Sequence, residues 1–189
     1  MARAADSAPA FSRAQRYIAE RVSDALDRLD PATIHRVVEL IARAPATFAY
    51  GAGRSGIVAR AFAMRLVQLG LTAYVIGESV TPIVRRGDAV VILSGRGESY
   101  SSIQTANIVR REGAELIVIT GHATSKLAHI ATALLPIGFP EDAERPRWAP
   151  LGTLFESAGL RLTDAIVAEL MVVRGETEES MRRRHAIMV

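Results

Sequence analysis

The sequence predicts an α/β protein: a three-layer α/β/α sandwich in which helices cover both faces of a parallel sheet of about five strands, preceded by N-terminal helices. Three observations support this prediction. Short apolar runs with little alternation recur along the chain, stretches with helical periodicity separate them, and two of the runs end in glycine-rich turns. Continuous apolar runs are typical of strands that are buried on both faces, and strands that alternate with helices are typical of a parallel sheet.

The length and composition fit one domain. The chain has 189 residues, of which 49% are hydrophobic, so we expect residues 11–189 to form a single domain with a well-buried core. Residues 1–10 are rich in Ala, Ser and Pro and lack a hydrophobic segment, so we expect a disordered tail there rather than a signal peptide.

The composition excludes several kinds of site. Because the chain has no cysteine, it has no disulfide and no thiolate metal site, which fits a reducing cytoplasm. No apolar stretch approaches the roughly 18–20 residues of a membrane span, so we expect no membrane partner.

The net charge of +3 does not indicate nucleic-acid binding, because the basic residues are spread along the chain. Their densest cluster, at residues 182–184, follows the acidic residues Glu176, Glu178 and Glu179. We interpret this end as a solvated C-terminal helix with charges of both signs. The alternative is a patch that binds a polyanion.

Two helices are expected before the first strand. Apolar residues at helical spacing predict an amphipathic helix over residues 11–29. Asp30 and Pro31 then form a helix start, since Asp is a favoured N-cap and Pro fits the first helical position. The second helix is expected to end near Arg43.

Strands and helices then alternate. The apolar or β-branched runs predict strands at residues 47–50, 73–76, 89–93, 116–120 and 133–137. Helical periodicity predicts helices at residues 55–69, 101–112, 125–130 and 149–174. Residues 138–147 combine glycine, proline and charged residues, and they form either a mobile flap beside the site or a simple surface connection.

The two glycine-rich turns are the strongest functional signal. Each lies between an expected strand and an expected helix: Gly51–Gly56 reads Gly-Ala-Gly-Arg-Ser-Gly, and Ser94–Ser99 reads Ser-Gly-Arg-Gly-Glu-Ser. Glycine lets the backbone approach an anion closely, and the amide groups and dipole of a helix start attract negative charge. Neither turn has the Gly-Lys-Ser/Thr of a nucleotide-binding loop, so the pair predicts a site for a single phosphate monoester.

Both turns supply candidate phosphate ligands. They are Gly53, Arg54, Ser55, Ser94, Arg96, Ser99, Ser101 and Ser102. The alternative role for the serines is helix capping, since they stand where N-caps stand, and both roles can hold together. Glu98 would repel a phosphate, so we expect its carboxylate to bind a backbone amide or an arginine, with a catalytic role as the lesser alternative.

Five segments, in their order along the chain, resemble the sugar isomerase (SIS) domain family. They are the two turns, Arg-Ala-Phe-Ala-Met-Arg-Leu at 60–66, Gly-Glu-Ser-Val-Thr-Pro at 77–82 and Ala-Pro-Leu-Gly-Thr-Leu-Phe-Glu at 149–156. The turns mark the superfamily. The segments 77–82 and 149–156, with the ending Arg-His-Ala at 184–186, are most similar to the 6-phospho-3-hexuloisomerase branch. The likeness covers nearly the whole chain.

The resemblance implies an isomerase that needs no organic cofactor. No metal is required either, if a carboxylate transfers the proton and nearby donors polarise the carbonyl. Its implied reaction interconverts D-arabino-3-hexulose 6-phosphate and D-fructose 6-phosphate through an enediol, in the ribulose monophosphate pathway of formaldehyde fixation. Its implied partners are this small sugar phosphate, other copies of the chain in a homotetramer with sites near subunit contacts, and, as a functional link, 3-hexulose-6-phosphate synthase.

The chain departs from the family's usual pattern at the second turn. Where relatives commonly read Ser-Gly-Ser-Gly-Glu-Thr, this chain has Arg96 in the third place and Ser99 in the sixth. Serine in place of threonine keeps the hydroxyl. Arg96 replaces a hydroxyl by a guanidinium that faces either the pocket or solvent, so the phosphate geometry and the substrate preference stay open here.

Glu156 and His185 are the candidate catalytic residues. Moving the carbonyl from C3 to C2 requires a base that takes the proton from C2, and a carboxylate can do so. Glu156 lies at the margin of the apolar stripe of the 149–174 helix, inside a segment that resembles the family. His185 lies in the resembling tail, where a C-terminal helix that reaches a neighbouring subunit can deliver it as an acid. The alternative for both is a solvated surface residue.

The other histidines differ in their expected places. His122 follows the expected strand 116–120 at its carboxyl end, the sheet edge where α/β proteins bind ligands, so it is a candidate substrate contact. His35 and His129 fall in helical stretches and are expected to be structural or surface residues.

Two other functions stay open. The first is an isomerase for another phosphosugar, such as arabinose 5-phosphate or sedoheptulose 7-phosphate. The second is a non-catalytic SIS module that senses a phosphosugar. Such modules usually come fused to a helix-turn-helix domain, and the residues before the first expected strand show no convincing recognition helix.

Overall fold

The computed structural model describes residues 9–186 of the chain. Residues 1–8 of the tail expected at 1–10, and residues 187–189, lie outside the described residues. The described part contains a five-stranded sheet in which every strand pairing is parallel, as predicted. The strands are β1 Thr47–Gly51, β2 Ala73–Val75, β3 Ala89–Ser94, β4 Glu115–Thr120 and β5 Ala133–Pro136.

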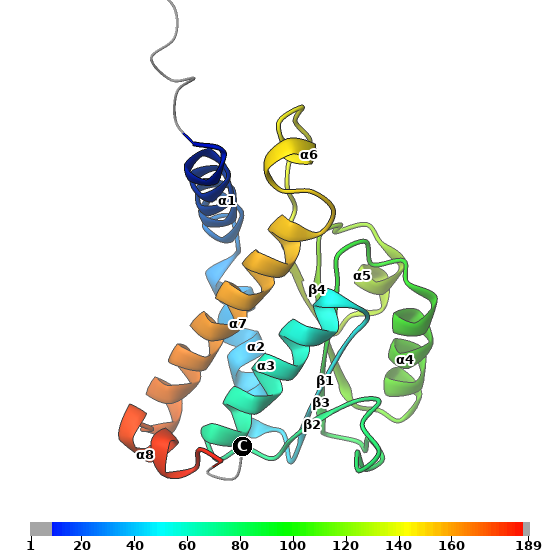
Figure 1. Ribbon diagram of the computed structural model, residues 1–189. Helices are drawn as coiled ribbons and strands as arrows, with labels where there is room; N and C mark the ends of the chain where they lie inside the picture. Colours follow the sequence, from blue (N-terminus) through cyan, green and yellow to red (C-terminus); the bar gives the residue numbers. More distant parts are fainter. Residues whose placement is uncertain (1–8, 187–189) are drawn as a thin grey trace, which may run out of the picture.

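Helices precede the sheet and then alternate with its strands (Figure 1). They are α1 Ala10–Leu26, α2 Pro31–Arg43, α3 Arg54–Gln68, α4 Tyr100–Arg111, α5 Lys126–Ile130, α6 Arg145–Trp148, α7 Thr153–Arg174 and α8 Glu178–Arg183. None of the helices within residues 9–186 is long and apolar enough to cross a membrane.

The structure differs from the sequence prediction at three helices. α1 begins at Ala10, inside the stretch where the tail was expected. The short helix α6 was not predicted, and α7 begins at Thr153 rather than at residue 149. α7 begins later than predicted because Leu151 has a positive φ of 58°, which breaks the helical geometry between α6 and α7.

The start of α2 confirms the cap that the sequence predicts. The Asp30 carboxylate accepts hydrogen bonds from the backbone N–H groups of Ala32 and Thr33, and Pro31 takes the first turn. A cap of this kind satisfies amide groups that have no partner inside the helix, and it favours the helix start at this position.

Each face of the sheet has its own helical cover. Successive residues of a strand point to opposite faces, so Ala89, Val91 and Leu93 of β3 pack in a cluster with α1, α2, α3 and α7. Val90 and Ile92 point the other way and pack with α4 and α5. Figure 1 shows the two sets of helices on either side of the sheet, which is the predicted three-layer sandwich.

The strand order places a switch point between β1 and β3. The order is β2-β1-β3-β4-β5, so the chain runs from β1 outward to β2 and then crosses back to β3. The connection from β1 therefore leads to α3 on one face, whereas the connection from β3 leads to α4 on the other. Open α/β sheets bind ligands in the crevice that this divergence leaves at the carboxyl ends of the strands.

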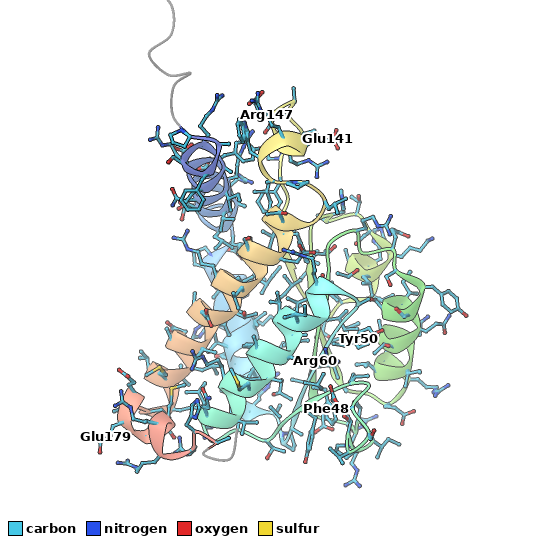
Figure 2. All side chains as sticks on the ribbon, in the orientation of Figure 1. Phe48, Tyr50, Arg60, Glu141, Arg147 and Glu179 are labelled. Atoms are coloured by element: carbon cyan, nitrogen blue, oxygen red, sulfur yellow. The ribbon has the colours of Figure 1, made fainter. Side chains whose placement is uncertain are left out.

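The C-terminal end is tied to α3 by one arginine. Arg184 donates two hydrogen bonds of 2.9 Å to the Glu176 carboxylate and one of 3.1 Å to the carbonyl of Gln68. α8 also carries the ion pairs Glu178–Arg182 and Glu179–Arg183 on its exposed surface. Figure 2 shows Glu179 at this end of the molecule. A solvated helix with charges of both signs is what the sequence predicts.

Candidate active site

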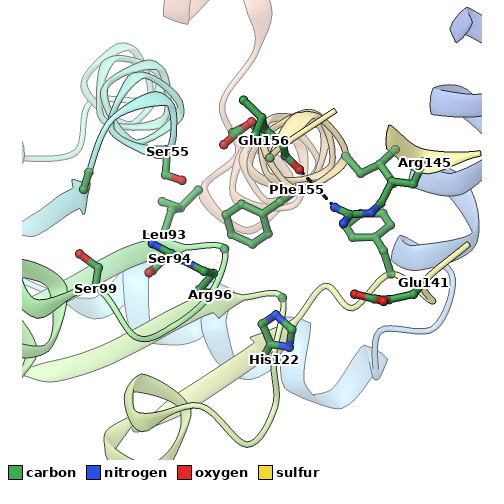
Figure 3. Close-up of a pocket in the computed structure, with 17 residues that line it drawn as sticks. Ser55, Leu93, Ser94, Arg96, Ser99, His122, Glu141, Arg145, Phe155 and Glu156 are labelled. Atoms are coloured by element: carbon green, nitrogen blue, oxygen red, sulfur yellow. Dashed lines mark hydrogen bonds between the residues drawn. The ribbon is translucent and has the colours of Figure 1, made fainter. Parts of the chain in front are cut away.

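A pocket of about 650 Å³ opens at the carboxyl ends of the strands, at the switch point (Figure 3). Its volume falls within the roughly 300–1,000 Å³ that small-molecule sites occupy. The walls come from both glycine-rich turns, the end of β4, the segment 139–152 and the first turn of α7.

The first turn lets β1 run directly into α3. A Cβ atom at Gly51 would lie 2.6 Å from the carbonyl carbon of Ser55, and a Cβ at Gly56 would lie 2.6 Å from the oxygen of Gly51. Gly53 is the N-cap of α3 and has φ 59° and ψ −132°, a conformation that side chains disfavour. This packing buries Ser55 and brings it to the pocket wall.

The second turn places two serine hydroxyl groups at the pocket. Ser94 ends β3 and Ser99 is the N-cap of α4, and both line the pocket. The Ser99 hydroxyl makes no capping bond; its Oγ lies 3.1 Å from the Oγ of Ser101. The N–H groups in the first turn of α4 begin at the same place, so an anion there meets both kinds of donor.

Glu98 is tied to α5, which confirms the expected bond to a backbone amide. Its Oε1 accepts a hydrogen bond of 2.9 Å from the N–H of Lys126, and its Oε2 lies 3.1 Å from the Lys126 Nζ. The backbone bond first, and the ammonium group after it, lower the pKa of Glu98. Its negative charge is thereby partnered beside the second glycine-rich turn.

Glu156 lies in the first turn of α7 and faces the pocket. Its side chain is only 14% exposed, and its Oε2 accepts a hydrogen bond of 2.9 Å from Nε of Arg54. Arg54 comes from the first glycine-rich turn and is itself 66% exposed. The ion pair therefore joins the start of α3 to the start of α7 and fixes the carboxylate at the rim of the pocket.

Residues 138–147 lie beside the pocket, as expected for a flap, and whether they are mobile stays a prediction. Phe139, Glu141 and Arg145 of this segment line the pocket, and sequence reasoning missed all three as site residues. A signal for Arg145 exists, because Asp142 precedes it by three positions and Pro146 follows it, which is a helix-start pattern. Figure 3 shows Glu141 and Arg145 across the pocket from Ser55, Ser94 and Ser99.

The two histidines that were candidate functional residues lie far apart. His122 follows β4 and lines the pocket, where it was expected as a candidate contact. His185 follows α8, beyond the far end of α7 (Figure 1). α7 has 22 residues and so spans about 33 Å. His185 therefore lies too far from the pocket of its own chain to reach it.

The remaining predicted residues surround the pocket. Those that line it are Ser55, Ser94, Arg96, Ser99 and Glu156. Gly53 and Arg54 belong to the first turn and Ser101 and Ser102 to the first turn of α4, without lining the pocket. The hydroxyl of Ser102 is buried and has no hydrogen-bond partner within residues 9–186. The binding and catalytic roles of these residues stay predictions.

Known proteins resemble this chain along most of its length. The SIS domain model matches residues 40–174. A 3-hexulose-6-phosphate isomerase of Methylomonas aminofaciens is 33% identical over 179 residues, which cover 93% of this chain and 98% of the relative. A protein of the same name from Bacillus subtilis is 36% identical over 143 residues, which cover 74% of this chain and 77% of that protein.

A solved structure agrees with these relatives. The crystal structure of a hypothetical protein from Methanococcus jannaschii, for which the function of 3-hexulose-6-phosphate isomerase was inferred, superposes with a TM-score of 0.81 at 26% identity. The match covers 90% of this chain and 98% of that one. The fold and the resemblance predicted from the sequence are confirmed: the chain belongs to the SIS domain family, together with relatives named 3-hexulose-6-phosphate isomerase.

Proposed function

We propose that the protein is a phosphosugar isomerase that interconverts D-arabino-3-hexulose 6-phosphate and D-fructose 6-phosphate. One observation carries the proposal: a single pocket joins the two glycine-rich turns to the sheltered carboxylate of Glu156. The relatives that carry this activity in their names match the chain over its length, which supports the same reaction here.

The phosphate would bind at the second turn. Ser94 and Ser99 offer hydroxyl donors there, Arg96 offers a guanidinium, and the N-terminus of α4 adds backbone N–H groups. Ser55 faces the same space from the first turn. Holding the sugar by its phosphate fixes how far its carbonyl end extends, so the reacting carbons would lie near Glu156.

Glu156 would act as the base. It would take the proton from C2 of the 3-hexulose phosphate, and the resulting enediol would accept a proton at C3 to give fructose 6-phosphate. His122 lines the same pocket and would contact the sugar, as the sequence suggests.

The proposal includes self-association into a homotetramer. α3 exposes Ile57, Met64 and Val67, which are 63%, 52% and 47% exposed. Apolar side chains gathered on one exposed helix favour an interface. In such an assembly His185 would enter the pocket of a neighbouring subunit as an acid. The enzyme would work in the cytoplasm, beside a synthase that makes its substrate.

A product assay tests this function. The purified protein is incubated with fructose 6-phosphate, and the sugars are followed by carbon NMR. We expect a new ketone signal at C3 that grows to a constant ratio with the C2 ketone. Parallel samples contain arabinose 5-phosphate or sedoheptulose 7-phosphate. Turnover of either of these, with fructose 6-phosphate unchanged, would assign the protein to another phosphosugar.

A further inference from the structure

Arg145 is a cation in the pocket that the proposed reaction does not yet use. Its guanidinium donates one hydrogen bond, of 3.4 Å from Nη1 to the carbonyl of Leu151, and no carboxylate within residues 9–186 lies within ion-pair distance of it. A bond of this length is weak, so a better acceptor in the pocket would replace it. Arg54, by contrast, is already paired with Glu156.

The place of Arg145 is fixed by a contact with the N-terminal helix. Asp142 accepts a hydrogen bond of 2.9 Å from the backbone N–H of Arg145 through Oδ1, and its Oδ2 accepts a bond of 2.8 Å from the Tyr17 hydroxyl. Arg21 forms an ion pair with the same Oδ2. α1 therefore holds the segment that carries Arg145 against the pocket.

Arg145 lies opposite the serines, where the carbonyl end of a bound sugar phosphate would lie. Ser55, Ser94 and Ser99 lie on one side of the pocket and Arg145 on the other, with Phe155 between them (Figure 3). Leu151, whose carbonyl binds Arg145, belongs to the turn that leads into α7 and Glu156. A sugar held by its phosphate on the serine side would present its carbonyl end to Arg145.

The proposed reaction creates a charge at that end. When Glu156 takes the proton from C2, the electrons of the C–H bond form the C2–C3 double bond, and the carbonyl π electrons move to O3. The intermediate is an enediolate. The O2 hydroxyl then passes its proton to the O3 oxyanion, O2 becomes the new carbonyl oxygen, and the electrons of the C2–C3 double bond take the proton from Glu156 at C3. No further reactant is needed, but the charge on oxygen requires a donor.

We infer that Arg145 binds the oxygens at C2 and C3 and stabilises the enediolate, as a further catalytic residue. This inference rests on the proposed function. A guanidinium presents paired N–H donors to two adjacent oxygens, and it acts more strongly on the charged intermediate than on the neutral ketone.

Two probes separate this role from phosphate binding. Arabinonate 5-phosphate places a carboxylate at the carbon that corresponds to C2, counted from the phosphate, whereas sorbitol 6-phosphate carries only hydroxyls. The variant Arg145→Met removes the charge at similar length. Arg147→Met is the matched control, because Arg147 lies on the same short helix over the Trp148 ring and does not line the pocket.

For Arg145→Met we expect the affinity for arabinonate 5-phosphate to fall about 10-fold or more, with the affinity for sorbitol 6-phosphate within about 2-fold. We expect kcat to fall about 10²-fold with little change in KM. Arg145→Lys, which keeps the charge, should recover part of both losses. Arg147→Met should behave as the wild type.

The inference is overturned if Arg145→Met weakens both probes equally, since Arg145 would then hold the phosphate or the pocket shape. It is also overturned if neither probe is affected. Unchanged binding of sorbitol 6-phosphate shows that the variant is folded. A wild-type protein that converts no sugar phosphate would refute the proposed function, whereas an active wild type with an equally active Arg145→Met refutes only the role of Arg145.

Discussion

The carboxylate of Glu156 occupies the space that a side chain at Gly152 would need. A Cβ atom at Gly152 would lie 2.2 Å from Oε1 of Glu156 and 2.8 Å from its Oε2. Gly152 has φ −89° and ψ 7°, which any residue can adopt. Glycine is therefore needed at this position to leave room for the Glu156 carboxylate, and not because of its backbone conformation.

Gly152→Ala should move the carboxylate without unfolding the protein. We expect kcat to fall by up to about 10²-fold, the scale of a misplaced catalytic group, with thermal stability nearly unchanged. Gly159→Ala in the same helix is the control, because its Cβ would meet Leu93 and Val58 at ordinary distances of 3.4 and 3.7 Å. Wild-type kcat in Gly152→Ala would show that the position of the carboxylate does not matter.

Arg96 is expected to hold the phosphate. It lines the pocket, and a guanidinium bound to a phosphate and shielded from water contributes about 1.5–3 kcal/mol, against about 0.5–1.5 for the serine hydroxyl that the family pattern would place there. Steady-state kinetics of Arg96→Ser should show KM raised about 10-fold with little change in kcat. An unchanged KM would mean that Arg96 faces solvent, where an ion pair contributes at most about 1 kcal/mol.

Shared sites can be tested by mixing two inactive variants. His185→Ala keeps Arg184 and its bonds to Glu176, so it removes the imidazole without releasing the C-terminal end. Mixed with Glu156→Gln, it should restore roughly a quarter of the wild-type rate, because some interfaces then pair an intact Glu156 with an intact His185. Mixed oligomers, verified by mass spectrometry, that stay inactive would exclude His185 from the neighbour's site.

The bond between Arg184 and Glu176 makes the stability of the fold depend on pH in the acidic range. The hydrogen bonds from Arg184, and then that from Ser180, lower the pKa of Glu176 from 4.5 to about 2. A carboxylate with a depressed folded pKa stabilises the fold above its unfolded pKa, and this contribution is lost as the pH falls toward 2.

The melting temperature of Glu176→Gln should therefore lie below that of the wild type at pH 7, and the difference should shrink between about pH 4.5 and 2. Glu179→Gln serves as the control, because its pair with Arg183 is exposed and contributes little. A difference between wild type and Glu176→Gln that stays constant over this range would show that the ionised pair does not anchor the end of the chain.

The parts of the fold that depend on local signals could be predicted from the sequence. The buried strands appear as apolar runs, and the Asp30–Pro31 start of α2 follows from capping chemistry. The far wall of the pocket could not be predicted in this way. Arg145 lies on a segment that Asp142 joins to Tyr17, a contact between residues 125 positions apart that no local pattern encodes.

The site itself was predicted in part. The glycine turns marked the switch point because their backbone requirements are visible as residue types, and Glu156 was visible through its motif. The pairing of Glu156 with Arg54, and its contact with Gly152, depend on how α7 and α3 meet at the pocket. That geometry is a property of packing between distant helices.

The most direct test of the account is hydrogen exchange on the substrate in deuterium oxide. The wild-type protein is incubated with fructose 6-phosphate, and Glu156→Gln is treated in the same way, with proton NMR at C1 and C3. We predict that the wild type replaces the hydrogen at C3 by deuterium and leaves C1 unlabelled, and that Glu156→Gln exchanges about 10²-fold more slowly. Deuterium at C1 instead of C3, or equal exchange by the two proteins, would contradict it.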